Sequence, residues 1–203
     1  MLPAKPHRGR KIYTLDDLRT ELRWLRLFRM LWLIPASLNI GAVIIALRNH
    51  TFEAGLEWKV SVGLGLASIP FMIIIASLGS SKLMVAVREV HPQPTGDWVA
   101  VLIRSLSYRG ARNAAWEKLA ELLPYIGPDE ALHVHPRLCE SLYKQSEFMA
   151  AHYRQSVFDA AVRFQDRRAI RYMRKLLTSS TIPEEERVRI LANLNTLSGS
   201  AER

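Results

Sequence analysis

Two long stretches of the chain contain no charged residue. The first covers residues 30–47, between Arg29 and Arg48, and the second covers residues 60–81, between Lys59 and Lys82. At 1.5 Å per residue, such helices would be about 27 and 33 Å long, and the hydrocarbon core of a bilayer is about 30 Å thick. The pattern therefore predicts a two-helix transmembrane hairpin over residues 30–81.

A leucine stripe precedes the first uncharged stretch. Its leucines recur at intervals of three and four residues while arginines occupy the other side, which is typical of an amphipathic helix. Thr14 and Asp17 have the spacing of a capping box at the start of that helix. Residues 1–29 are therefore expected to form a basic tail and an amphipathic helix at the membrane interface. The stripe consists of Leu15, Leu18, Leu22 and Leu25.

The distribution of cations predicts the orientation of the hairpin. Eight Lys and Arg residues precede the first uncharged stretch, whereas the connection over 48–59 holds two residues of each sign. By the positive-inside rule, the chain is expected to be a multi-pass protein of the cytoplasmic (inner) membrane with both termini in the cytoplasm. Residues beside the spans should anchor them at the interface and contact lipid. These anchors are Arg23, Trp24, Arg26, Arg29, Trp32, Trp58, Lys59 and Lys82.

Small residues one helical turn apart predict close packing of the two spans. Such spacing lets helix backbones approach one another, or alternatively lets the hairpin bind another membrane subunit. Asn39 is the most polar residue within a span, and it is interpreted as an interhelix hydrogen-bonding group or, alternatively, as a transport-site ligand. The residues assigned to this packing are Ser37, Asn39, Gly41, Gly63, Gly65 and Ala67.

The rest of the chain shows helical patterns and no convincing strand alternation. A connecting helix and linker over 82–96 ends near Pro92 and Pro94, and residues 97–203 are expected to form a cytoplasmic helical domain. The expected fold class is therefore all-α, with this domain following the transmembrane hairpin. Its predicted helices cover residues 97–107, 112–126, 136–151, 154–164, 166–178 and 183–196.

Two segments of this domain, 115–123 and 169–177, share an apolar pattern. Ala115, Trp116, Leu119, Leu122 and Leu123 fall opposite Ala169, Ile170, Met173, Leu176 and Leu177. With these segments, residues 97–197 resemble HEAT or armadillo-type helical repeats, although the offset between the segments exceeds the usual repeat length of about 40–47 residues. The resemblance implies stacked antiparallel helix pairs that present a concave face to a protein partner. An irregular helical bundle is the alternative.

Six cations lie close together near the C-terminal end of the domain, from position 163 to position 175. They are interpreted as a surface for anionic lipid or for an acidic partner protein, or as a solvated helix face. RNA is the least favoured partner, because only Phe164 and Tyr172 supply nearby aromatic rings. A formal net charge of +9 does not decide between these options. The six cations are Arg163, Arg167, Arg168, Arg171, Arg174 and Lys175.

No pattern in the sequence predicts catalysis or a cofactor. His133, His135 and Cys139 have metal-ligating side chains, but no second ligand pair accompanies them, so no metal site is expected. The sequence contains neither a glycine-rich phosphate loop nor a nucleophile-base arrangement. Cys139 is the one cysteine, so no intramolecular disulfide can form.

These features favour a membrane-anchored helical adaptor, an accessory or scaffold subunit of a larger membrane protein assembly. Its expected partners are membrane lipid and one or more proteins, with nucleic acid unlikely and a homo-oligomer possible. The alternative function is an oligomeric channel or transporter component, since a two-helix unit lines a pore only by self-association. No enzymatic activity is expected.

Overall fold

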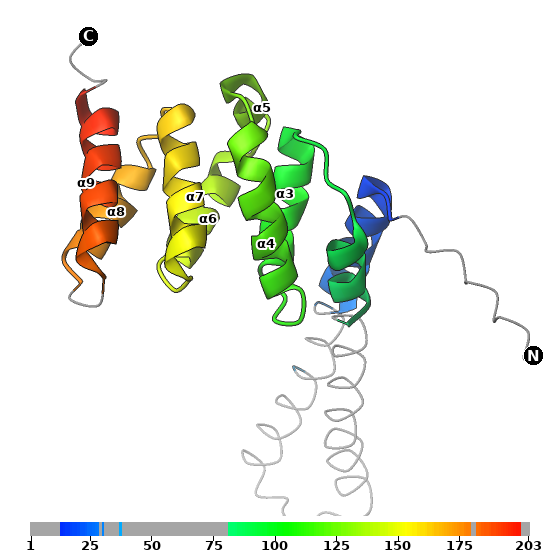
Figure 1. Ribbon diagram of the computed structural model, residues 1–203. Coiled ribbons are helices and arrows are strands. Elements are labelled where there is room, and N and C mark those ends of the chain that lie inside the picture. The colour runs from blue at the N-terminus through cyan, green and yellow to red at the C-terminus, as the bar shows by residue number, and fades with distance from the viewer. Residues whose placement is uncertain (1–12, 29, 31–36, 38–80, 180–181, 200–203) are drawn as a thin grey trace, which may run out of the picture.

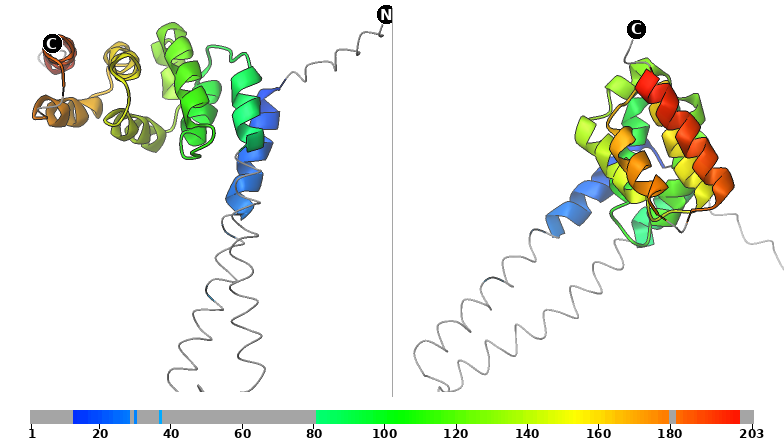
Figure 2. Two further views of the ribbon diagram at one scale, coloured as in Figure 1. Left: turned by 60° about the horizontal axis from the view of Figure 1, so that its bottom comes forward. Right: turned by 90° about the vertical axis from the view of Figure 1, so that its left-hand side faces the viewer.

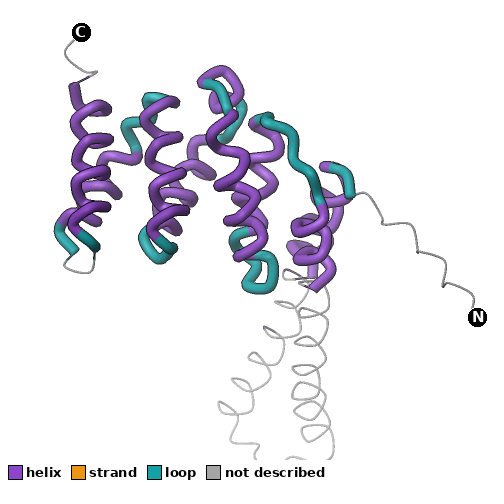
Figure 3. Tube along the Cα trace, viewed as in Figure 1, coloured by secondary structure: helices purple, strands orange, loops and turns teal. Residues whose placement is uncertain are grey.

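The computed structural model describes residues 13–28, 30, 37, 81–179 and 182–199. Every regular element in these ranges is a helix (Figure 3). The all-α expectation is therefore confirmed for the described part of the chain.

From residue 81 onward, the described helices follow one another closely along the chain. Two N-terminal helical segments cover residues 15–28 and 81–89. The elements after them are α3 (Gly96–Ser105), α4 (Arg112–Leu122), the short 3-10 helix η1 (Leu123–Tyr125), α5 (Pro128–Leu132), α6 (Pro136–Ser146), α7 (Ala151–Arg163), α8 (Ala169–Leu177) and α9 (Glu184–Gly199).

The long helices after residue 95 stack as pairs. Helix α3 packs on α4, α6 on α7, and α8 on α9, and contacts between pairs run from α3 to α6 to α8 and from α4 to α7 to α9. The result is two layers of helices that extend along one axis (Figures 1 and 2). The three pairs begin at Gly96, Pro136 and Ala169.

One apolar core joins the layers. Trp116 of α4, Phe158 of α7 and Met173 of α8 are fully buried in it. Large apolar side chains on each helix recur every three or four residues, so each helix turns one side toward its neighbours and leaves the other in water. The apolar stripes noted in the sequence around Trp116 and Met173 are therefore core positions.

The leucine stripe near the N-terminus belongs to the same core. Leu18, Leu22 and Leu25 are buried with side chains of segment 81–89 and α3. On the polar side, Arg19 forms an ion pair with Asp97 at the start of α3, with 2.9 Å between nitrogen and oxygen. Residues 15–28 therefore bury their apolar side against protein, whereas the stripe was expected to lie on a membrane surface.

The capping box at the start of this segment is confirmed. The backbone N–H of Thr14 donates to Asp17 Oδ2 at 2.9 Å, and the N–H of Asp17 donates to Thr14 Oγ1 at 3.3 Å. Each side chain thus satisfies a backbone donor that the first turn of a helix leaves without a partner.

The predicted transmembrane hairpin and the multi-pass location in the inner membrane are contradicted. Within the described ranges, no helix is both long enough and apolar enough to cross a bilayer. Helix α9, the longest from α3 onward, has 16 residues and begins with three glutamates, whereas a span needs about 20 apolar residues. The orientation of the termini was deduced from the hairpin, so it loses its basis. Of the stretch 30–81 assigned to the hairpin, the structure describes only residues 30, 37 and 81.

All six helices predicted after residue 96 are present, with different ends. The helix predicted over 136–151 ends at Ser146, and a loop separates it from α7. The five-residue helix α5 was not predicted. Helices α4 and α8, which contain the two similar apolar patterns, lie in different layers, because α4 is the second helix of its pair and α8 is the first.

Candidate partner-binding groove

A polar groove of about 420 Å³ lies between α6 and α8. On α6, Arg137, Ser141 and Lys144 line it, and they share one side of the helix because they are spaced by four and three residues. The opposite side of α6 buries Leu142 and Tyr143 in the core. The sequence of α6 thus places Arg137 and Lys144 on the side of the helix that faces the groove.

Helix α8 forms the other wall in the same way. It buries Met173 and Leu176, and this orientation leaves Arg171 and Lys175 on the groove side. Because Arg171 and Lys175 are four residues apart, they lie one helical turn from each other. The groove therefore has a row of cations on each wall.

Two carboxylates of the α6 wall pair with the cations of α8. Glu140 Oε1 accepts from Arg171 at 3.4 Å and from the Tyr172 hydroxyl at 3.2 Å. Glu147, just after α6, accepts from Lys175 Nζ at 2.7 Å through Oε2. The side chain of Glu147 is only 7% exposed, and its Oε1 is buried without a hydrogen-bond donor in the described part of the chain.

A smaller hollow of about 170 Å³ continues the groove toward the N-terminal segments. Arg26 of segment 15–28 and Arg104 of α3 line it, and no carboxylate does so. Ser141 lines both spaces, so they adjoin at the middle of α6. Together they form a track of cationic side chains along the layer of α3, α6 and α8.

A partly buried polar cluster fixes the start of α8 relative to α6. The Tyr143 hydroxyl donates to Asp166 Oδ2 at 2.7 Å, and the Arg168 guanidinium donates to both oxygens of Asp166 at 2.7 and 2.8 Å. Burial alone would raise the pKa of Asp166, but these hydrogen bonds outweigh it and lower the pKa. The pKa of Tyr143 is raised by its burial and by the adjacent negative charge of Asp166.

The turn before α8 has a left-handed residue. Gln165 has a φ of 52°, and the N–H of Asp166 donates to the carbonyl of Ala161 at 2.9 Å, five residues earlier. This is the hydrogen bond of a Schellman motif, in which glycine is usual at the left-handed position. The motif ends α7 and directs the chain into α8, which sets the second wall of the groove.

The six cations that were predicted to form one surface have different contacts in the structure. Only Arg171 and Lys175 line the groove. Arg163 donates to the carbonyls of Leu123 and Pro124 and so links α7 to η1. Arg168 is held by Asp166, while Arg167 and Arg174 are exposed but line neither space.

Sequence reasoning missed the contribution of α6. Arg137 and Lys144 lie seven residues apart, which is two helical turns, and this spacing was available in the sequence. The pairing with α8 was not available, because it depends on which helices become neighbours in the stack.

The predicted interface anchors are dispersed. Arg26 lines the smaller hollow, Arg23 and Lys82 are exposed, and Trp24 packs near Phe28 with 6.1 Å between ring centres. The other anchors, Arg29, Trp32, Trp58 and Lys59, lie outside the described residues. Of the residues assigned to packing of the spans, only Ser37 is described, while Asn39, Gly41, Gly63, Gly65 and Ala67 lie outside.

His133, His135 and Cys139 do not assemble a metal site. In the ranges that the structure describes, no three His, Cys, Asp or Glu side chains are placed to hold a metal ion. His135 instead caps α6, because its Nδ1 accepts from the N–H of Arg137 at 3.2 Å. Burial and the nearby charge of Asp166 raise the pKa of Cys139, which disfavours its thiolate form.

Comparison of the chain with protein-family models, curated proteins and solved structures found no match.

Proposed function

We propose that this chain is a helical adaptor that binds a protein partner along the layer of α3, α6 and α8. The observation that carries the proposal is the groove between α6 and α8, with its adjoining hollow beside α3. The two spaces form one polar track with several cations and no assembled catalytic group. Such a track favours binding of another macromolecule over chemistry on a small substrate.

The stacked arrangement of helix pairs supports the same function. The pairs begin at Gly96, Pro136 and Ala169, and this spacing is similar to the length of the units in helical repeat proteins. Stacks of this kind present extended surfaces to partner proteins, because each pair adds another helix to the same face. The spacing and stacking of the pairs are the features in which the chain resembles HEAT or armadillo-type repeats.

A site-specific photo-crosslinker tests the proposal. A photoreactive amino acid at Ser141, which lines both spaces, is expected to join covalently to one partner protein in cells that express the chain. The matched control has the same amino acid at Glu117, an exposed position of α4 in the other layer. The captured protein is then purified, and its binding to the full chain is measured directly.

Equal labelling from Ser141 and Glu117, or none from Ser141, would contradict an adaptor role for this face. A product that contains only a second copy of the chain would show self-association in place of an adaptor.

A further inference from the structure

We infer that the groove between α6 and α8 receives an extended, acidic segment of a partner protein. The inference rests on the proposed adaptor function and adds the chemistry of the partner. The groove is lined by four cations, Arg137, Lys144, Arg171 and Lys175, and by two carboxylates, so its net charge is +2. The adjoining hollow adds Arg26 and Arg104 without a carboxylate.

The cations of the two walls differ in what they contact. Arg171 and Lys175 of α8 each pair with a carboxylate from the α6 wall. The side chains of Arg137 and Lys144 are exposed and form no ion pair with any described residue. Arg137 and Lys144 of α6 are therefore the cations with which a carboxylate of the partner protein can form an ion pair.

The spacing of these two cations matches an extended chain. Arg137 and Lys144 are seven residues apart on one helix, which corresponds to about 10 Å along its axis. An extended chain in the polyproline II conformation has three residues per turn and advances about 3.1 Å per residue, so carboxylates three residues apart lie on the same side and about 9 Å apart. A segment with an acidic residue at every third position thus places one carboxylate near each cation.

The pair between Arg171 and Glu140 is suited to exchange. Its atoms are 3.4 Å apart, and the two side chains are 76% and 48% exposed. Exposed ion pairs of this kind contribute little to stability, so a partner carboxylate can replace Glu140 beside Arg171 at little cost. Glu140 therefore acts as a competitor for the acidic segment.

The groove is less suited to a nucleic acid. A nucleic acid carries a charge on every nucleotide, whereas only two cations of the groove, Arg137 and Lys144, form no ion pair with a described residue. Tyr172 is the aromatic residue of its lining and is 5% exposed, so its ring offers no open face for base stacking.

Fluorescence anisotropy with a defined probe tests the inference. The probe is a labelled 12-residue peptide with glutamate at every third position and serine elsewhere, titrated with the full chain. Substituting both Arg137→Glu and Lys144→Glu is expected to weaken binding about tenfold or more, because two attractions become repulsions. Added salt is expected to weaken binding by the wild-type chain, since exposed charges are screened.

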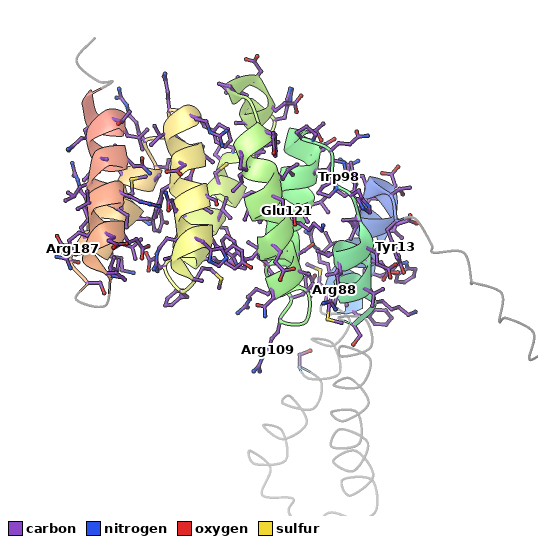
Figure 4. The ribbon with its side chains drawn as sticks, viewed as in Figure 1. Tyr13, Arg88, Trp98, Arg109, Glu121 and Arg187 are labelled. Carbon is purple, nitrogen blue, oxygen red and sulfur yellow. The ribbon has the colours of Figure 1, made fainter. Side chains whose placement is uncertain are left out.

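The matched control is the double variant Lys82→Glu and Arg88→Glu. It changes the net charge by the same amount, and both residues are exposed on segment 81–89 and line neither space. Figure 4 shows Arg88 on this segment, at the opposite end of the stack from Arg187 on α9. Binding by the control is expected to stay within about twofold of the wild type, because distant exposed charges are screened.

A change in the opposite direction strengthens the test. Glu140→Gln keeps a carbonyl acceptor for the Tyr172 hydroxyl but removes a negative charge from the groove. It is expected to tighten binding of the glutamate peptide about two- to threefold, because Arg171 loses its internal competitor. Both groove variants are checked for an unchanged thermal midpoint, and Arg137→Gln with Lys144→Gln replaces the reversal if folding is impaired.

The inference is overturned if the groove reversal and the control reversal weaken peptide binding equally, or if Glu140→Gln has no effect. Tighter binding of a single-stranded oligonucleotide of equal charge would assign the groove to nucleic acid instead. If Ser141 crosslinks a partner whose binding is insensitive to these charges, the adaptor function stands and the acidic-segment inference fails.

Discussion

The polar side chains of the two layers of the helix stack differ in what they contact. In the layer of α4, α7 and α9, polar groups pair between helices, as when Asn193 donates to Asp159 at 2.8 Å and Arg189 donates to Gln155 at 2.5 Å. In the layer of α3, α6 and α8, two cations of α6 lack such partners among the described residues and border an open groove. These polar groups of the α4, α7 and α9 layer thus pair within the chain, whereas the α3, α6 and α8 layer has positive charge available for a partner.

The largest expected effect comes from breaking the buried pair that joins α7 to α9. Arg154 donates to both oxygens of Glu186 at 2.5 and 3.0 Å, and the two side chains are 12% and 9% exposed. Glu186→Ala is expected to lower the free energy of unfolding by about 3–5 kcal/mol, because it leaves a buried guanidinium without its partner. Urea denaturation measures the change.

Glu184→Ala is the control for this prediction, since its side chain is 81% exposed in the same first turn of α9. Its expected cost is below about 0.5 kcal/mol. Equal costs for the two variants would show that the pairing between α7 and α9 does not stabilise the stack.

A smaller effect is expected in the polar cluster at the start of α8. Tyr143→Phe removes the hydroxyl that donates to Asp166 and is expected to lower the free energy of unfolding by about 1–2 kcal/mol at neutral pH. Because the pKa of Asp166 is lower in the folded chain, its contribution is present above the unfolded pKa of about 3.9 and is lost as the pH falls through the folded value. Unfolding curves from pH 7 to pH 2 test this dependence.

Asp166→Asn is the control for the dependence of stability on acid pH, because an amide side chain takes up no proton between pH 7 and pH 2. Its loss of stability between pH 5 and pH 2 should be smaller than that of the wild type. An identical acid dependence in both proteins would assign the acid sensitivity to other carboxylates.

The turn into α8 offers a stabilising change. Gln165→Gly removes the cost of a left-handed backbone at a φ of 52° and is expected to raise the free energy of unfolding by about 0.5–1 kcal/mol. The thermal midpoint should rise accordingly. A lower midpoint would mean that contacts of the Gln165 side chain outweigh the backbone cost.

The smallest change in stability is expected for a groove residue whose substitution should still weaken peptide binding. Arg171→Ala is expected to change the free energy of unfolding by less than about 1 kcal/mol, because its pair with Glu140 is exposed. Peptide binding by the same variant should weaken measurably. A stability loss as large as that of Glu186→Ala would make the groove a structural element of the stack.

The sequence predicted most of the helices after residue 96. Apolar positions around Trp116 and Met173 recur at helical spacing, and Pro136 marks a helix start because proline suits the first turn. The short helix α5 escaped prediction, since its residues, Pro128–Leu132, bury no side chain and so carry no apolar stripe.

The candidate groove was predicted only in part. A cluster of cations around Arg171 was visible, but a linear cluster does not distinguish Arg163, which binds backbone carbonyls of η1, from Lys175, which faces the groove. The burial of residues 15–28 against protein was missed for a related reason. The leucine stripe of residues 15–28 has the same period whether it faces lipid or protein.

By itself, the sequence determined the helical class, the capping box at Thr14 and the positions of the apolar stripes, because these depend on neighbours within one or two helical turns. Only the tertiary structure decided that Leu18 packs against protein and that α6 and α8 face each other across a charged groove. Those outcomes depend on contacts between residues distant in the chain, and helical periodicity specifies which side of a helix is apolar but not what covers it.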